Sequence, residues 1–359
     1  MQNPQRTQLV SVAIPSYNSA HFITETLESI FAQTYSSIEI IVVDDGSSDG
    51  TAEALKPYMD RIVYHRQPNG GLAAARNAAL RLARGEFIAW CDADDLCEPD
   101  RIAIQAAYLC HNEQVVAVGS NFSAFETGKG IFDPSHAASY YSELAENGFA
   151  GLFPNVEDFD GRGVAWLEQP LSPSRRVYWG NVWKRLLLGN FMHPPTMMIR
   201  TSACARTGWL AEDVKTNEDW EYITRLSRLG PVASIDAPLL RYRRHPNQMS
   251  GNSAMGALSC IRVFEGHRRL CGDDAEMVRQ IDVRLARTHA VASYRLAEGE
   301  RRKALKHLLA AVGIAPGESR FFFHLARIVV PHRGVQLLKS LRRRYGSCGD
   351  AHRRQSKPA

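Results

Sequence analysis

Short aliphatic and β-branched runs alternate with segments of helical periodicity through the first 120 residues, and this alternation limits the possible folds more than any other feature. The run Ile40-Ile41-Val42-Val43 is typical of a strand buried on both faces. Apolar residues at helical spacing over 23–33 and an Ala-rich stretch over 72–84 predict helices between such strands. The pattern therefore predicts an α/β fold, with a mainly parallel sheet and helices on both of its faces. Further strands are expected at 10–15, 62–65, 87–91 and 115–119, and further helices at 51–58 and from Pro99 onward.

Acidic side chains follow two of these predicted strands, at the edge of the sheet where ligands of such folds bind. Several carboxylates crowded at one edge repel one another, and a divalent cation with oxygen ligands removes that repulsion and recruits a phosphate. The alternative is that the aspartates only cap the turns and helices that follow. The side chains are Asp44, Asp45, Asp92, Asp94 and Asp95.

Other phosphate and nucleophile motifs fit less well. No G-x-G-x-x-G follows a strand, so a dinucleotide fingerprint is excluded. The segment Gly46-Ser47-Ser48-Asp49-Gly50 matches G-x-S-x-G, the nucleophile elbow of serine hydrolases. The acidic neighbours of Ser48 would oppose a developing oxyanion, and a Ser/Gly turn is the simpler interpretation. A serine hydrolase stays as a minor alternative.

Four segments, in this order along the chain, resemble glycosyltransferase family 2. The resemblance implies a GT-A fold, which is a Rossmann-like, mixed but mainly parallel sheet flanked by helices, here with a helical C-terminal extension. It also implies transfer of a sugar from a nucleotide sugar to a hydroxyl acceptor. The segments are 10–18 (VSVAIPSYN), 39–51 (EIIVVDDGSSDGT), 70–77 (GGLAAARN) and 85–95 (GEFIAWCDADD).

The resemblance assigns donor roles to several of the aspartates. Asp92-Ala93-Asp94 matches the D-x-D element. Asp94 would hold Mn²⁺ or Mg²⁺ against the donor diphosphate, while Asp92 would contact the ribose or share the metal. Asp45 would read the base by accepting from the N3–H of uracil, which makes a UDP-sugar the expected donor.

Further donor residues follow from the same resemblance. Pro15 and Tyr17 would line the base and ribose pocket, with Asn18 beside them, and Arg76 would reach toward the base or the phosphates. The alternatives are an ordinary half-buried aromatic for Tyr17 and a surface helix arginine for Arg76.

The second half of the chain must supply a base, because inverting transfer is a single displacement in which a carboxylate removes the acceptor proton. Asp219 is the expected base, within a stretch that resembles the family's E-D motif, and Glu218 and Trp220 would border the acceptor. Trp220 could stack on a sugar, or pack in the core with Ile223 and Leu226 at helical spacing. The acidic residues could instead complement a helix dipole.

Two further motifs resemble parts of the family. The stretch 193–200 looks like an edge strand under the acceptor site, where His193 would touch the acceptor or diphosphate or else be structural. His245 lies in a Y-R-x-H-like loop that would close over the metal and diphosphate, which makes it a third candidate metal ligand. Arg243 or Arg244 would neutralise charge on the leaving group.

The chain divides into a donor-binding half at 1–125, an acceptor-binding half at 126–252 and a basic helical region at 253–359. Within the second part, 126–180 is rich in Gly, Pro and aromatic residues, and we interpret it as a long acceptor-site loop. Its prominent aromatic residues are Trp166, Tyr178 and Trp179.

Charge is unevenly distributed along the chain. Residues 1–259 carry 22 Lys and Arg against 29 Asp and Glu, whereas residues 260–359 carry 21 against 9. The apolar and basic residues of 327–344 are typical of an interfacial helix on anionic lipid, although a solvated basic helix would look the same. No nucleic-acid motif is present. With seven scattered cysteines, no apolar secretory core and no long apolar run, we expect a cytoplasmic protein, peripheral on the membrane if the tail binds lipid.

These observations converge on one function and one competitor. The leading hypothesis is a metal-dependent inverting glycosyltransferase that transfers a sugar from a nucleotide sugar to a saccharide or lipid-linked acceptor, in surface or extracellular polysaccharide assembly. The competitor is a non-catalytic nucleotide-sugar-binding scaffold. Retention of both Asp94 and Asp219 favours the enzyme.

Overall fold

The computed structural model describes residues 7–316 apart from 168, 247, 249–252 and 298. The chain divides into two compact units, Met1–Gly251 and Asn252–Ala359. The strands are β1 (Val10–Ser16), β2 (Ile38–Asp44), β3 (Val63–Arg66), β4 (Phe87–Trp90), β5 (Leu96–Cys97), β6 (Ala117–Glu126), β7 (Gly130–Asp133), β8 (Asn155–Phe159), β9 (Arg175–Gly180), β10 (Met198–Arg200) and β11 (Val232–Arg243). The α-helices of the first unit are α1 (Ile23–Phe31), α2 (Thr51–Leu55), α3 (Leu72–Leu82), α4 (Arg101–His111), α5 (Ala137–Tyr140), α6 (Ser142–Leu152), α7 (Trp183–Leu186), α8 (Thr201–Thr207) and α9 (Glu218–Leu226).

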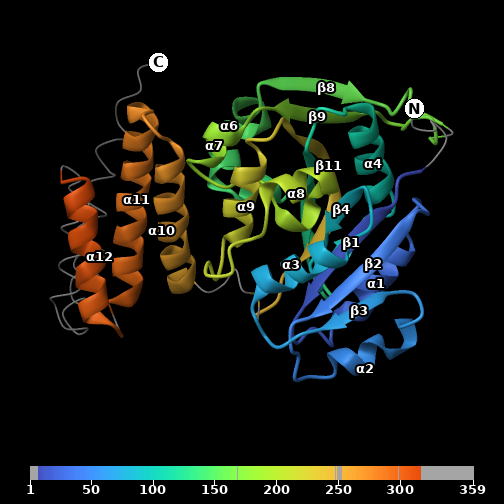
Figure 1. Ribbon diagram of the computed structural model, residues 1–359, viewed down its shortest axis with the longest axis horizontal. Helices are drawn as coiled ribbons and strands as arrows, with labels where there is room; N and C mark the ends of the chain where they lie inside the picture. Colours follow the sequence, from blue (N-terminus) through green and yellow to red (C-terminus); the bar gives the residue numbers. More distant parts are fainter. Residues whose placement is uncertain (1–6, 168, 247, 249–252, 298, 317–359) are drawn as a thin grey trace, which may run out of the picture. The chain divides into compact units, whose positions relative to one another are not determined.

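The first unit is built on a mixed sheet whose N-terminal half is parallel, as the alternating pattern predicts (Figure 1). The strand order there is β3-β2-β1-β4, and each neighbouring pair is parallel. Every residue of β1 is buried, as are the last five of β2, because helices cover the sheet on both faces. α3 packs on β1 and β2, and α4 packs on β6. The carboxyl ends of β1, β2 and β4 therefore meet at one edge.

The other half of the sheet continues β4-β10-β6-β11-β9-β8 and contains antiparallel pairs. The expectation of an edge strand at 193–200 is wrong. β10 lies inside the sheet, antiparallel to β4 on one side and to β6 on the other. Its apolar residues explain the position, because Met198 and Ile199 are both fully buried. The first residues of the stretch form no strand: Pro194–Thr196 is a short 3-10 helix.

The expectation of a long aromatic loop at 126–180 is also wrong. The segment contains β7, α5, α6, β8 and β9, and β9 pairs with β11 in the main sheet. Tyr178 and Trp179 are residues of β9. The Trp166 ring packs edge-on against Tyr35, with 5.0 Å between centroids. Tyr178 and Trp179 thus belong to a paired strand, as their high β-propensity favours, and Trp166 packs against Tyr35.

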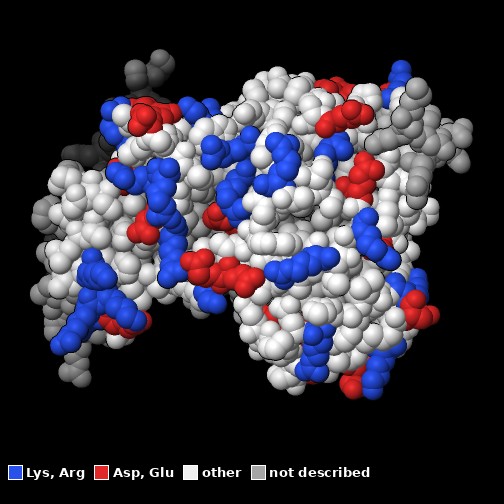
Figure 2. Space-filling view, viewed as in Figure 1, with Lys and Arg blue, Asp and Glu red and all other residues white. Residues whose placement is uncertain are grey.

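The second unit contains α10 (Ser253–Leu270), α11 (Ala275–Leu296) and α12 (Arg301–Ile314). α11 packs against both other helices. The side chain of Asp274 caps α11 by accepting from the backbone N–H of Met277 at 3.1 Å. On the face shown in Figure 2, basic side chains of this unit are interspersed with acidic ones. The buried core consists of Ala286, Ala290, Leu296, Ala297, Ala304, Leu308 and Ala311.

The predicted interfacial segment 327–344 lies outside the described residues. Within the part of the chain that is described, none of the helices combines the length and the apolar character needed to span a bilayer.

Gly85 permits close packing of β1 against the turn that precedes β4, and its substitution should destabilise the first unit. A Cβ atom there would lie 2.6 Å from the backbone N of Ser11 and 2.7 Å from the carbonyl O of Leu9. We expect Gly85→Ala to lower the free energy of unfolding by about 1–3 kcal/mol, measured by urea denaturation. The control is Arg84→Ala, which removes an ion pair of an exposed arginine and should cost at most about 1 kcal/mol. Equal costs for the two variants would contradict the steric explanation.

Candidate active site

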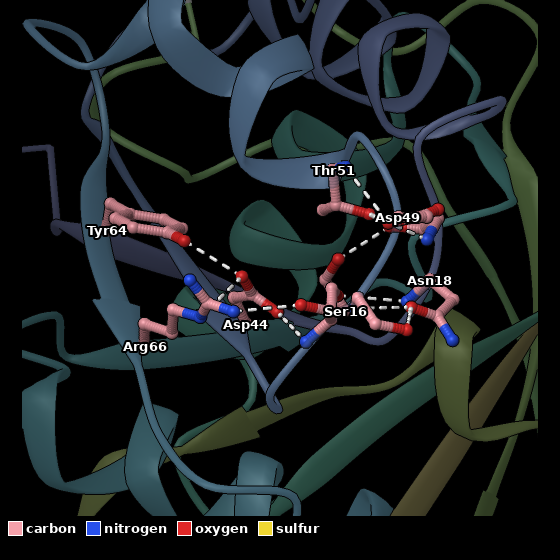
Figure 3. Close-up of polar contacts among 10 residues, drawn as sticks. Ser16, Asn18, Asp44, Asp49, Thr51, Tyr64 and Arg66 are labelled. Atoms are coloured by element: carbon pink, nitrogen blue, oxygen red, sulfur yellow. Dashed lines mark hydrogen bonds and ion pairs between the residues drawn. The ribbon is translucent and has the colours of Figure 1, made fainter.

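The loops that follow β1 and β2 are joined by a dense set of hydrogen bonds (Figure 3). Asp44 is fully buried at the end of β2, where it accepts from the Ser47 backbone N–H at 2.8 Å and from the Tyr64 hydroxyl at 2.8 Å. Burial, together with this carboxylate, raises the pKa of Tyr64 to about 12. Arg66 lies 3.6 Å from the same carboxylate. Asp44 therefore organises the loop and leaves ligand contact to its neighbours.

Asn18 joins the β1 loop to the β2 loop. Its backbone N–H donates to the Ser47 hydroxyl at 2.9 Å, and its side-chain oxygen accepts from the Ser48 backbone N–H at 2.9 Å. The φ of +51° at Asn18 is in the left-handed region that asparagine tolerates. Next to it, Tyr17 is 54% exposed, so its ring is free to meet a ligand beside Pro15 at the end of β1.

Ser48 does not have the surroundings of a hydrolase nucleophile. Its hydroxyl faces the side-chain oxygen of Asn18 at 3.4 Å, and among the described residues no histidine hydrogen-bonds to it. The segment 46–50 is thus a Ser/Gly turn, consistent with the simpler interpretation of the sequence.

Asp45 anchors the start of α3. Its Oδ1 accepts from Gln67 Nε2 at 2.8 Å and from the Gly70 N–H at 2.9 Å, and its Oδ2 accepts from the Gly71 N–H at 2.7 Å. Gly71 has a φ of +91°, which favours glycine at this helix start. Asp45 is 3% exposed, and these three bonds use most of the acceptor positions of its carboxylate.

Arg76 is buried and bridges two parts of the chain, so the alternative of a surface arginine is wrong. Its side chain is 2% exposed. Nη2 lies 2.9 Å from Asp92 Oδ1, and Nη1 lies 2.9 Å from Glu218 Oε1. The guanidinium also lies 5.1 Å from the centre of the Trp90 ring. Both terminal nitrogens are thus engaged with protein acids.

The D-x-D segment lies directly after β4 and has one acid on each side of a buried residue. Asp92 is paired with Arg76, whereas Asp94 Oδ2 lies 2.9 Å from His245 Nε2. Between them, the Ala93 carbonyl accepts from the Thr26 hydroxyl at 2.9 Å, which fixes the backbone. Burial and the charge of Asp92 raise the pKa of Asp94, and the His245 hydrogen bond opposes that rise.

Arg243, at the end of β11, fastens the D-x-D segment from the other side. It is 1% exposed, and its Nε donates to the Asp94 carbonyl at 2.8 Å while its backbone N–H donates to Asp95 Oδ1 at 3.0 Å. Its other nitrogens bond to Glu25 Oε2 at 2.9 Å and to the hydroxyl of Thr127. Arg243 is thus fully engaged in the protein, and Arg244 is the exposed member of the pair.

Protein groups supply only part of the coordination that a divalent cation would need at this site. Among the described residues, no group of three or more His, Cys, Asp or Glu is arranged to hold a metal ion. Asp94 Oδ2 and His245 Nε2 lie 2.9 Å apart, and Asp92 lies two residues before Asp94. Mg²⁺ and Mn²⁺ are commonly bound through one or two carboxylates together with substrate phosphates. The donor set therefore suits a cation whose coordination is completed by a diphosphate.

The acidic start of α9 faces the D-x-D segment through Arg76. Glu218 is 2% exposed; burial and Asp219 raise its pKa to about 8, against the effect of Arg76. Burial also raises the pKa of Asp219, again opposed by Arg76, and Asp219 Oδ1 accepts from the Trp220 backbone N–H at 2.8 Å. Asn217 precedes the helix with a φ of +63°.

Two residues assigned to the acceptor site belong to the core instead. Trp220 is 3% exposed, and its indole N–H donates to the Leu186 carbonyl at 2.7 Å, so it offers no platform to a sugar. His193 stacks on Phe122 with 4.0 Å between ring centroids, and its Nδ1 lies 3.0 Å from the Tyr141 hydroxyl. Burial lowers the pKa of His193 to about 3, so it is neutral and structural.

A family model described as glycosyl transferase family 2 matches residues 11–167. A glycosyltransferase of Rickettsia typhi is 42% identical over 260 residues, which cover 72% of this chain and 70% of the relative. The chain belongs to glycosyl transferase family 2. Glycosyltransferase GlyA of Streptococcus pneumoniae is 33% identical over 181 residues, which cover 50% of this family 2 chain but only 25% of that relative.

Solved structures show that this family 2 protein has a fold of the GT-A type. Crystal structures of TarS from S. aureus, one in complex with UDP and one in complex with UDP-GlcNAc, give TM-scores of 0.56 and 0.57. The matches cover 89% of this chain and 88% of TarS, at 18% and 17% identity. A mannosyltransferase from Pyrobaculum calidifontis in complex with GDP-Man and Mn²⁺ gives a TM-score of 0.50 at 21% identity, over 90% of this chain and 80% of that protein.

Sequence patterns did not reveal several residues that shape the family 2 site. Glu25 and Thr127 hold Arg243, and Tyr141 reaches His193. Burial raises the pKa of Tyr141, so this hydroxyl stays protonated beside His193. None of these residues belongs to a motif, and only the fold brings them to the site.

The buried His193 should make stability depend on pH. Its pKa of about 3 lies below the ordinary 6.5, so between these values the unfolded chain binds more protons, and stability falls as the pH falls through that window. Between pH 7 and 5.5, the free energy of unfolding should fall by about 1 kcal/mol more in the wild type than in His193→Gln. Urea denaturation at both pH values measures the difference; parallel losses in the two proteins would contradict a neutral buried His193.

Proposed function

We propose that the chain catalyses metal-dependent, inverting transfer of a sugar from a UDP-sugar to a hydroxyl group of a saccharide or lipid-linked acceptor. The observation that carries this proposal is the direct link between the D-x-D segment and the acidic start of α9. Arg76 lies 2.9 Å from Asp92 and 2.9 Å from Glu218, although these acids are far apart in the sequence. A donor-binding element and a candidate base thus share one site.

The loop ends of β1 and β2 support a nucleotide pocket. Tyr17 is exposed beside Pro15, and Asp45 retains acceptor capacity after its three hydrogen bonds. Asn18 fixes the two loops relative to each other. The TarS structures hold UDP and UDP-GlcNAc, and the Pyrobaculum enzyme holds GDP-Man with Mn²⁺, which supports a nucleotide sugar as donor here.

Asp94 would hold the divalent cation, with Asp92 and His245 as further ligands. The two carboxylates and the imidazole lie on adjoining loops, and Arg243 fixes the backbone of Asp94 from behind. When bound, Mn²⁺ or Mg²⁺ supplies positive charge that stabilises the departing diphosphate.

Asp219 would act as the general base. Burial raises its pKa, which makes its carboxylate a better proton acceptor than an exposed aspartate. In the proposed reaction, Asp219 takes the proton of the acceptor hydroxyl, the acceptor oxygen bonds to the anomeric carbon, and the bond to the nucleoside diphosphate breaks. A single displacement of this kind inverts the anomeric configuration. The neighbouring Glu218 is engaged with Arg76 at 2.9 Å, and we therefore assign the role of base to Asp219.

We propose a saccharide or lipid-linked acceptor in surface or extracellular polysaccharide assembly. The tail that would hold the enzyme at an anionic membrane lies outside the described residues. Binding of the full chain to anionic vesicles, lost on truncation after Ser319 and in high salt, would support that location; indifference to both changes would contradict it.

Donor binding is tested by a thermal-shift panel of nucleotide sugars with and without Mn²⁺. We expect a UDP-sugar to raise the Tm most and to need Mn²⁺, because the metal site is completed by the diphosphate. Asp94→Asn should abolish the Mn²⁺-dependent part of the shift. The control is Asp133→Asn, an acid on β7 that pairs with His136 and should leave the shift unchanged. A nucleotide response independent of Mn²⁺ in the wild type would contradict the metal assignment.

The base assignment is tested with Asp219→Asn. The variant should bind donor and Mn²⁺ as the wild type does but lose at least about 100-fold in kcat, since general base catalysis contributes about 10² to 10⁴. Nucleotide release from the donor selected by the panel measures the rate. A normal rate would remove Asp219 as the base, and a loss of donor binding would assign it to the donor pocket instead. A protein that binds donor but never releases nucleotide would support the scaffold alternative.

A further inference from the structure

Consecutive residues of α3 reach across the site into the second half of the first unit. Asn77 donates to the Leu210 carbonyl at 3.0 Å and to Glu212 Oε1 at 2.9 Å, and it accepts from the Leu210 N–H at 2.8 Å. Arg76 reaches Glu218, which lies eight residues after Leu210. α3 therefore carries both a neutral anchor and a charged anchor for the segment that leads into α9.

The charged anchor has two arms with different surroundings. On one arm, Asp92 is 30% exposed and lies within reach of solvent and of a bound donor. On the other arm, Glu218 is 2% exposed, and Arg76 is the hydrogen-bonding side chain that meets it from outside α9. Loss of the guanidinium would leave the buried Glu218 carboxyl without its hydrogen bond from Arg76, whereas Asp92 could turn to water or to a cation.

We propose that Arg76 is a positioning residue that sets the distance and orientation of the base helix α9 relative to the D-x-D segment. The inference rests on the proposed function, and it replaces the expectation that Arg76 contacts the base or phosphates of the donor. One rigid, planar guanidinium bonds to Glu218 with Nη1 and to Asp92 with Nη2, so movement of either acid changes the geometry at the other. Glu218 directly precedes Asp219, so the arm that holds Glu218 also holds the base.

This role differs from donor binding in a measurable way. A donor ligand would affect mainly the KM for the donor, because its contacts exist in the ground state. A residue that places the base should affect mainly kcat, because the misplaced carboxylate matters only when the proton moves. The two arms also predict unequal consequences: the loss should come through Glu218, which at 2% exposure cannot turn to solvent.

The test is a double-variant cycle with Arg76→Gln, Glu218→Gln and both together, measured by nucleotide release from the donor that the thermal-shift panel selects. Arg76→Gln alone should lower kcat, with a smaller change in the donor KM. In the Glu218→Gln background, the loss caused by Arg76→Gln should shrink by about tenfold to a hundredfold, because the bond between Arg76 and the Glu218 carboxyl is already lost. The double variant carries two neutral side chains that can bond to each other. If Arg76→Gln folds poorly, the kcat of the double variant is compared with that of Glu218→Gln.

Two further variants separate positioning from general stability. Arg76→Lys keeps the charge but cannot bond to both acids in a fixed fork, so it should recover only part of the kcat. The matched control is Arg225→Gln on α9. In the wild type, Arg225 pairs with Glu221 and donates to the Thr207 and Trp209 carbonyls, and the variant loses these contacts. That variant should lower the Tm while its kcat stays near the wild-type value.

Several results would overturn the inference. The inference is wrong if the kcat losses of Arg76→Gln and Glu218→Gln simply multiply in the double variant. It is also wrong if Arg76→Gln raises the donor KM at constant kcat, or if Arg225→Gln loses as much kcat as Arg76→Gln. The failure of the proposed function looks different. If Asp219→Asn releases nucleotide at the normal rate while the coupling between Arg76 and Glu218 persists, the base assignment is wrong and the positioning role stands, with Glu218 as the group that is placed.

Discussion

Two buried arginines hold together an edge of the sheet that would otherwise repel itself. The ends of β2 and β4 and the start of α9 bring many carboxylates close to one another, and burial makes each uncompensated charge costly. Arg76 neutralises Asp92 and Glu218, while Arg243 fixes the backbone around Asp94 and Asp95. Both guanidiniums are almost fully buried. The positions of Asp92, Glu218 and the Asp94–Asp95 segment therefore depend on these two cations.

The negative charge of some of these acids is fully offset by hydrogen-bond donors and cations of the protein, and that of others only in part. This difference organises the site. Asp44 is satisfied by a backbone N–H, the Tyr64 hydroxyl and Arg66, so it serves the loop. Asp94 bonds to the His245 imidazole, but burial and the charge of Asp92 still raise its pKa. Acids of the second kind are the ones that a cation or a proton can still satisfy, and they are the ones that point to chemistry.

Local sequence patterns were sufficient for the parallel half of the sheet and for its acidic edge. β2 follows from a β-branched run and β1, β3 and β4 from short apolar runs, and their parallel arrangement brings Asp45 and Asp94 to the same edge. Residue patterns could not reveal β10 as an internal strand, because three residues carry no periodicity that separates an edge from a centre. They also misjudged 126–180, where aromatic residues belong to strands and packing.

Sequence motifs predicted which residues belong to the candidate site, but they did not predict which of these residues contact one another. Asp92, Asp94 and Asp219 lie in recognisable segments, whereas the partners of Arg76 are 16 and 142 residues away along the chain. Trp220 and His193 show the converse: each lies beside a motif, yet tertiary packing places both in the core.

The central claim is that the protein supplies only part of a metal site and that a diphosphate completes it. Titration of Mn²⁺ followed by electron paramagnetic resonance, with and without UDP, tests this claim most directly. The account predicts weak Mn²⁺ binding to the protein alone and much tighter binding in the presence of UDP, with UDP affinity rising by the same factor when Mn²⁺ is present. Equal Mn²⁺ affinity with and without UDP would contradict it.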